Sequence, residues 1–507
     1  MTLFVHRAER ADRLVDALGE LMAQPLADPF AVEVVAVPAK GIERWLTQQL
    51  ARRLGRRDGR ADGICAGVRF PSPTRLFTEL LDVGDRDPWA PDSLVWPLLD
   101  VIDAAAGEPW CDVLSIHLGV GAPESELVHR RGRRYAVARR LAGLFHDYAT
   151  QRPGVLADWA AGRDTDGFDG PLASDLNWQP ELWRRTRARI DGLDPVDRIR
   201  AAVDTGTADL PERISLFGPT RLPAAHLDLV DAVAEHRDVH LWLPHPSPVL
   251  WQRIAVVEVP AVIRRDADPT LLTPEHPLLS SLGRDSRELQ LALSTRPSVD
   301  RHHPGAEPPP TLLGRLQADL RDDRRPDVKL PLAPDDRSVQ VHACHGPSRQ
   351  IDVLREVLVG LLAADPTLEP RDILVMCPDI EVYAPLVAAA FGLADVVENG
   401  HPAHQLRVRL ADRALIQTNP LLATVTKLLD LADARVTASQ LLDLAAWPPV
   451  RRRFGFTDDD LETITRWTAD SGVRWGLDAA HRLPFGLSQF PQGTWRAGLD
   501  RILLGAT

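Results

Sequence analysis

The sequence is poor in several features that would mark particular protein classes. Only four cysteines occur among its 507 residues, and they form no C-x-x-C pair, which disfavours a disulfide framework or a zinc site. No apolar run approaches the roughly 18 residues needed to span a bilayer. The N-terminus meets charged residues at once and lacks the apolar stretch of a signal peptide. We therefore expect a cytoplasmic protein without a membrane association.

Lysine is also scarce, because Lys40, Lys329 and Lys427 are the only lysines among 59 basic residues. The formal net charge is −12. An acidic chain of this kind is not expected to bind nucleic acid over its whole surface, although it can contain a locally positive channel. The many arginines do not by themselves indicate phosphate recognition.

The motifs of a nucleotide-hydrolysing motor are missing as well. A strand predicted at 33–37 leads into a helix predicted at 41–54, where nucleotide-binding folds place a phosphate loop. The connecting sequence, PAKGIE, does not match G-x-x-x-x-G-K-[ST], because Lys40 precedes Gly41 instead of following a glycine run. The later strand at 213–217 ends in Gly-Pro-Thr, with no carboxylate to hold magnesium. We therefore expect no ATP hydrolysis, no other catalytic site and no bound cofactor or metal.

Two short clusters contain the residue types of metal ligands but fit structural roles better. In the segment His342-Ala343-Cys344-His345, a strand would point His342 and Cys344 to one face and His345 to the other. Three aspartates at 458–460 follow Thr457 and precede a helical pattern, which predicts a helix cap and not a magnesium site.

Hydrophobic periodicity predicts two α/β domains, each carrying a helical insertion. That layout resembles the two RecA-like (superfamily 1 helicase-like) parallel-sheet domains of helicases, here with a degenerate nucleotide site. In the second domain, the apolar segments 339–343 and 373–377 are expected to be strands. In chain order the predicted parts are the first half of the first RecA-like domain (1–85), its helical insertion (86–210), its second half (211–300), a proline-rich linker or surface crossing (301–336), the second RecA-like domain (337–435) and the truncated start of a second helical insertion (436–507).

Arginines gather near aromatic residues in three places. Such a surface suits a channel that tracks a phosphate backbone and stacks bases. A solvated helix face that pairs with nearby Asp and Glu explains each cluster equally well. The clusters are Arg130, Arg131, Arg133, Arg134, Arg139 and Arg140; then Arg184, Arg185, Arg187 and Arg189 after Trp183; and Arg451, Arg452 and Arg453 after Trp447.

Short motifs also occur in a fixed order along nearly the whole chain. They include G-x-x-x-W-L from Gly41, F-P-x-P from Phe70, C-H-x-P-x-R-Q from Cys344 and S-G-V-R-W-G from Ser471. In these motifs and their order the sequence resembles the RecC family, the gamma subunit of exodeoxyribonuclease V (the RecBCD enzyme). Members of that family are about twice as long, so the chain is similar to their N-terminal half.

The resemblance implies a non-catalytic DNA-binding subunit in double-strand break repair by homologous recombination. Its partners would be the RecB and RecD subunits, which would carry ATP and magnesium, together with double-stranded DNA ends and single-stranded DNA. Its helicase-like domains would form a channel for the unwound 3′-ended strand, which some members scan for a Chi sequence. The candidate DNA-binding residues that the resemblance places at this channel are Pro38, Lys40, Gly41, Arg44, Trp45, Ser72, Thr78, His146, Asp147 and Arg185.

Lys40 and Arg44 differ from the uncharged residues usual in the family at this turn, and their charge favours phosphate contact over base reading. The resemblance therefore implies strand guidance more directly than recognition of a particular Chi sequence. Two other functions stay open at this point. One is a diverged ATP-dependent DNA helicase, and the other is an assembly scaffold without DNA contact, which the net negative charge suggests.

Overall fold

The computed structural model divides the chain into two compact units, Met1–Gln340 (unit 1) and Val341–Thr507 (unit 2), and each is described by itself. Among the described residues, no helix combines the length and the apolar character that a membrane crossing demands. The structure describes residues 2–55, 63–81, 87–123, 133–168, 170–205, 210–258, 263–326, 331, 333–397, 400–411, 419–432 and 434–505.

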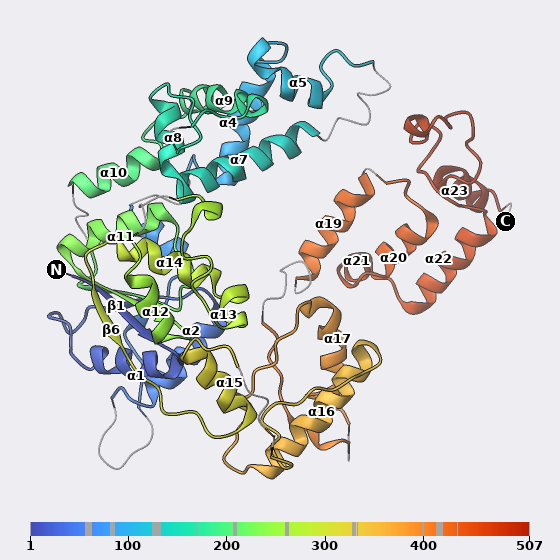
Figure 1. The fold of residues 1–507 in the computed structure, drawn as a ribbon. Coiled ribbons are helices and arrows are strands. Elements are labelled where there is room, and N and C mark those ends of the chain that lie inside the picture. Colours follow the sequence, from blue (N-terminus) through green and yellow to red (C-terminus); the bar gives the residue numbers. More distant parts are fainter. Residues whose placement is uncertain are drawn as a thin grey trace. The chain divides into compact units, whose positions relative to one another are not determined.

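Unit 1 is built on a six-stranded sheet in which every pairing is parallel (Figure 1). The side chains of its central strands are mostly buried on both faces, as in other parallel sheets, and include the buried polar residues His6 and His240. The register sets Leu241 opposite both Val5 and Leu216. The strand order is β3-β2-β4-β5-β1-β6, with β1 at Leu3–Ala8, β2 at Glu33–Ala36, β3 at Val68–Arg69, β4 at Arg213–Phe217, β5 at Asp238–Pro244 and β6 at Val299–His302.

Helices cover both faces of this sheet, because successive side chains of each strand point to opposite sides. Val35 packs in one core with α1 and α2, whereas Val34 and Ala36 pack in another with α3 and α11. The predicted first RecA-like sheet is therefore confirmed as a parallel α/β sheet. The helices of this part are α1 (Ala11–Met22), α2 (Lys40–Ala51), α3 (Pro73–Leu80), α11 (Ala224–His236), α12 (Pro248–Ala255), the 3-10 turn η3 (Arg265–Ala267), α13 (Pro277–Leu282), α14 (Arg284–Ser294) and α15 (Leu312–Arg321).

The stretch between α3 and β4 is helical where it is described, as the sequence predicts. It has its own core around the buried Trp159 and Trp183. Its longest helix, α7, packs against α11 of the sheet part (Figure 1). The predicted boundary at residues 85 and 86 lies outside the described residues. The elements of this helical insertion are α4 (Pro91–Ala104), η1 (Pro109–Cys111), α5 (Asp112–Leu118), α7 (Arg133–Gln151), α8 (Pro153–Ala160), η2 (Ser174–Leu176), α9 (Trp178–Arg187) and α10 (Pro195–Thr205).

The described part of the segment 301–336, predicted as a linker or surface crossing, is anchored to unit 1. The Asp323 side chain is fully buried and accepts hydrogen bonds from the backbone N–H groups of Glu275 and His276, each at 2.9 Å. It also forms an ion pair with Arg253 at 2.9 Å. The segment is thus a crossing held by buried polar contacts and not a free tether.

Unit 2 differs from the prediction in one respect. Neither the segment 339–343 nor the segment 373–377 forms a strand or pairs in a sheet, and the described part of unit 2 contains helices and only an isolated bridge between Thr437 and Trp475. A second parallel sheet is therefore not confirmed. The elements are α16 (Gly346–Ala364), η4 (Pro370–Asp372), α17 (Ile380–Ala390), η5 (Pro402–Gln405), α19 (Pro420–Ala432), α20 (Ala438–Ala446), α21 (Pro448–Phe454), α22 (Asp458–Asp470), η6 (Leu483–Phe485) and α23 (Trp495–Leu503).

The predicted cap at Thr457 is present at the start of α22. Its hydroxyl accepts from the backbone N–H of Asp460, and the Asp460 carboxylate accepts from the backbone N–H of Thr457. Across the described ranges, no cluster of three or more His, Cys, Asp or Glu is placed to hold a metal ion.

Candidate nucleic-acid interface

The turn between β2 and α2 lies at the C-terminal edge of the sheet, where open α/β folds bind their ligands. Only Val37, Pro38 and Ala39 separate the strand from the helix, so the turn is shorter than a phosphate loop of the G-x-x-x-x-G-K type. Ala39 provides no side-chain cap, and its carbonyl accepts from the N–H groups of Ile42 and Glu43, so the N–H groups of Lys40 and Gly41 remain open to an anion.

The two cations of this turn are both exposed to solvent. The Lys40 side chain is 87% exposed, and its Nζ forms an ion pair with Glu43 at 2.7 Å. Arg44 is exposed and makes no hydrogen bond or ion pair with another described residue. An exposed pair of this kind contributes little to stability, so both cations can turn to a phosphate.

The turn after β3 lies beside the turn after β2. The backbone N–H of Val37 donates to the carbonyl of Pro71 at 3.0 Å, which holds the two strand ends together. Ser72 caps α3 by accepting from the backbone N–H of Arg75 at 3.2 Å. The Thr78 hydroxyl donates to the carbonyl of Thr74 within the same helix. The sheet therefore brings Pro38, Lys40 and Ser72 to one edge.

Two further candidates at this edge differ in their surroundings. Trp45 of α2 is half-buried, and the centre of its ring lies 6.3 Å from that of Phe217 at the end of β4, so it packs between this helix and the sheet. A Cβ added to Gly41 would meet no atom within 4 Å, so the fold has room for a larger residue there. The packing at Gly41 does not require glycine.

His146 and Asp147 lie on α7 and are exposed. His146 lies close enough to His226 of α11 to help lower the pKa of that imidazole, which burial mainly brings down to about 4. His226 in turn stacks on Phe77 of α3, with the ring centroids 4.0 Å apart. This chain of contacts links α7 to the helix that carries Ser72 and Thr78 at its ends.

Arg185 is held inside the helical insertion. It forms ion pairs with Glu108 and Glu181, both at 2.8 Å, and its guanidinium lies 4.7 Å from the centre of the Trp110 ring. Hydrogen bonding to these carboxylates raises the pKa of Arg185. Its neighbours Arg184 and Arg187 are also paired with acids. For this cluster the paired helix face is the better description.

The other arginine clusters are more open. On α7, Arg134 pairs with Asp103, whereas Arg139 and Arg140 are exposed and make no ion pair with another described residue. On α21, Arg451 pairs with Asp458 at 2.8 Å. Arg130 and Arg131 lie outside the described residues.

Comparison with known proteins places the whole of this chain in one group. The family model described as "RecC, N-terminal domain" matches residues 3–323, and the model described as "RecBCD enzyme subunit RecC fourth domain" matches residues 418–507. The chain belongs to the RecC family. The first match runs through both halves of the sheet and the helical insertion, so these form one family unit despite the interruption in sequence.

Individual relatives agree with this assignment. The RecBCD enzyme subunit RecC of Mycobacterium tuberculosis (strain CDC 1551 / Oshkosh) is 54% identical over 511 residues, which cover 100% of this chain and 46% of the relative. That of Mycolicibacterium smegmatis is 54% identical over 520 residues, with the same coverage. That of Escherichia coli (strain K12) is 28% identical over 560 residues, covering 99% of this chain and 48% of the relative. The chain thus spans about half the length of these RecC proteins.

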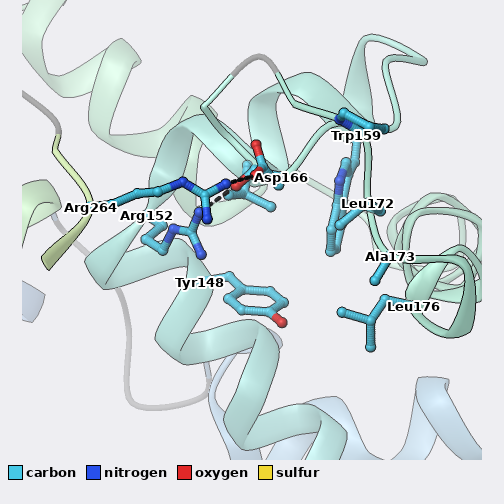
Figure 2. Close-up of a pocket in the computed structure, with 10 residues that line it drawn as sticks. Tyr148, Arg152, Trp159, Asp166, Leu172, Ala173, Leu176 and Arg264 are labelled. Atoms are coloured by element: carbon cyan, nitrogen blue, oxygen red, sulfur yellow. Dashed lines mark hydrogen bonds and ion pairs between the residues drawn. The ribbon is translucent and has the colours of Figure 1, made fainter. Parts of the chain in front are cut away.

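Two adjoining cavities next to the candidate residues were not predicted from the sequence of this RecC-family chain. The smaller, about 320 Å³, lies between Tyr148 and the segment 171–176, and Figure 2 shows Tyr148 and Arg152 across it from Leu172 and Leu176. The larger, about 580 Å³, is lined by four arginines. Arg152 and Arg264 line both cavities. The arginines of the larger cavity are Arg152, Arg221, Arg264 and Arg265.

Proposed function

We propose that this chain is a non-catalytic, DNA-binding part of a RecBCD-type helicase and nuclease that acts in double-strand break repair. Membership of the RecC family is the observation that carries the proposal. In this function the chain works with RecB and RecD subunits, which hold the ATP and magnesium. It contacts double-stranded DNA ends and the unwound single strand.

The proposed path of the 3′-ended strand follows the C-terminal edge of the sheet. The short turn at Pro38, the uncapped start of α2 and the exposed cations Lys40 and Arg44 support it. These groups suit phosphates, which position a strand without reading its sequence. Strand guidance is therefore the primary role, and scanning for a Chi-like sequence would need base contacts from other residues on the path.

The test uses the full-length protein assembled with its partner subunits and a DNA end with a 3′ single-stranded tail. Replacing Lys40 and Arg44 with alanine removes two cations, so we expect weaker binding and a salt dependence reduced by about 0.7 in log–log slope for each lost phosphate contact. Arg52→Ala is the matched control, because Arg52 is exposed and lies at the other end of α2, roughly 18 Å from Lys40 and roughly 12 Å from Arg44 along the helix.

The same experiment separates the alternatives. Unchanged affinity and salt slope in the Lys40 and Arg44 variants would rule out this edge as the strand path. Binding that is insensitive to salt in the unaltered complex would favour a scaffold without DNA contact. Saturable, magnesium-dependent binding of a fluorescent ATP analogue to this chain alone would favour the diverged helicase.

A further inference from the structure

Helix α19 of unit 2 turns its apolar side to the solvent, in contrast to the usual orientation of an amphipathic helix. None of its residues is buried. Five of its large apolar side chains are 44% to 68% exposed. They recur at intervals of three, four and seven residues, so they share one face of the helix, the apolar stripe of α19. The stripe consists of Leu421, Leu422, Val425, Leu428 and Leu429.

Another face of α19 is the one that packs inside unit 2. Lys427 Nζ lies 4.9 Å from the centre of the Trp447 ring, and Trp447 Nε1 donates to the carbonyl of Pro420 at 3.4 Å. Trp447 joins α20 to α21, and α21 packs against α19. These contacts hold α19 with Lys427 toward its neighbours and with the apolar stripe away from them. The exposure of the stripe is therefore not the result of a loosely attached helix.

The part of unit 2 that contains α19 has a small core. Among the described residues of 418–507, the buried hydrophobic side chains are those of Val436, Leu444 and Val473. The helical insertion of unit 1 instead buries a large apolar cluster around Trp159. A set of helices needs a second packed layer to bury its apolar faces. Residues 418–507 therefore require further apolar cover to form a complete domain.

The length of the RecC relatives indicates a source for this cover. The N-terminal family model matches from residue 3, and this chain covers 46% of the Mycobacterium tuberculosis relative. The corresponding remainder of a full-length protein follows Thr507. The helix before this point, α23, exposes Leu499 and Leu503 one turn apart. A later segment of the same chain can cover such faces as the domain folds, whereas a partner subunit would leave the domain with too small a core until assembly.

We propose that the apolar stripe of α19 is the docking face for a helix from the segment that follows Thr507 in the full-length protein. That helix contributes its own apolar side chains at intervals of three and four residues, so that the ridges of each helix fit the grooves of the other. Residues 418–507 then form one layer of a two-layer helical domain. The inference concerns the assembly of the chain itself and does not depend on the proposed DNA binding.

The experiment places the photoreactive amino acid p-benzoylphenylalanine in place of Leu421 in the full-length protein. The protein is irradiated alone and in complex with its partner subunits, and mass spectrometry of the crosslinked peptides identifies the segment that lies on the stripe. We expect crosslinks to residues beyond 507 in both samples. The same probe in place of Asp430 is the matched control. Asp430 is exposed on another side of α19, so this probe should give no such crosslink.

Thermal unfolding of the isolated full-length protein gives a second readout. Val425→Asp places a charge without a partner in the covered stripe, so the thermal midpoint should fall by several degrees. Asp430→Ala, at an exposed position of the same helix, should leave the midpoint nearly unchanged. If the Val425→Asp variant does not fold, the crosslinks from position 421 decide the question alone.

Crosslinks from position 421 that reach only a partner subunit would identify the stripe as a subunit interface and overturn the inference. Crosslinks to residues 1–507, or to a second copy in a mixture of isotopically light and heavy chains, would also overturn it. The absence of any crosslink would show that the stripe is uncovered, with the same consequence. None of these outcomes affects the DNA-binding test with the Lys40 and Arg44 variants, so the two proposals can fail separately.

Discussion

Units 1 and 2 both contain apolar segments, but these segments differ in burial and in strand pairing. In unit 1, Leu241 of β5 is fully buried between two neighbouring strands. In unit 2, the equally apolar segment 373–377 is unpaired, and its Leu374 and Met376 are 83% and 86% exposed. An apolar run becomes a strand only where neighbours supply hydrogen bonds and cover its faces. An apolar run in the sequence therefore shows that a segment can join a sheet, but it does not show that the segment does so.

The largest expected effect is a loss of stability on truncating a buried leucine of unit 1, compared with an exposed methionine of unit 2. Leu241→Ala should lower the free energy of unfolding of unit 1 by about 2–5 kcal/mol, because it opens a cavity in the centre of the sheet. Met376→Ala, the matched change in unit 2, should stay within about 0.5 kcal/mol. Hydrogen-exchange protection of the amides in each unit reports both values. A large loss from Met376→Ala would mean that the segment is covered in solution.

An effect of intermediate size is expected at acid pH, where buried histidines should lower the stability of unit 1. Burial lowers the pKa of His6 to about 3 and those of His240 and His245 to about 4. His6 also lies 3.0 Å from His303 and 3.1 Å from His240 through its two ring nitrogens. In the unfolded chain the pKa of histidine stays near 6.5, so the unfolded state binds more protons between pH 6.5 and 4.

The stability of unit 1 should therefore be complete above about pH 6.5 and fall as the pH decreases toward 4. We expect the thermal midpoint reported by Trp fluorescence to drop by several degrees between pH 7 and 5. His240→Gln should flatten this dependence, because glutamine does not titrate. An unchanged slope in that variant would assign the acid sensitivity to other groups.

The smallest expected effect concerns the N-terminal cap of α22 in unit 2. Thr457→Ala should destabilise α22 by about 1 kcal/mol, because it removes the cap that receives the backbone N–H of Asp460. Thr465→Ala, at an exposed position within the same helix, should cause no loss. Exchange rates of the α22 amides measure the difference. Equal effects of the two changes would show that the cap does not set the start of this helix.

Local patterns in the sequence predicted much of unit 1. The strand at 213–217 has the predicted bounds, and the helix after β2 begins at Lys40, one residue before the prediction. The site was predicted less completely. The sequence left open whether the cluster around Arg185 is paired with acids, because its partner Glu108 lies 77 residues away, beyond any local pattern. Arg264 and Asp166 are 98 residues apart, so the cavities beside Tyr148 had no sequence signal.

The sequence by itself determined the periodicity of each strand and helix, the helix caps, and the absence of a phosphate-loop motif, because these depend on residues close in the chain. The tertiary structure alone decided which apolar runs were buried, which arginines were neutralised by acids and where cavities formed. Burial and ion pairing depend on partners that are brought together only when distant segments pack against each other.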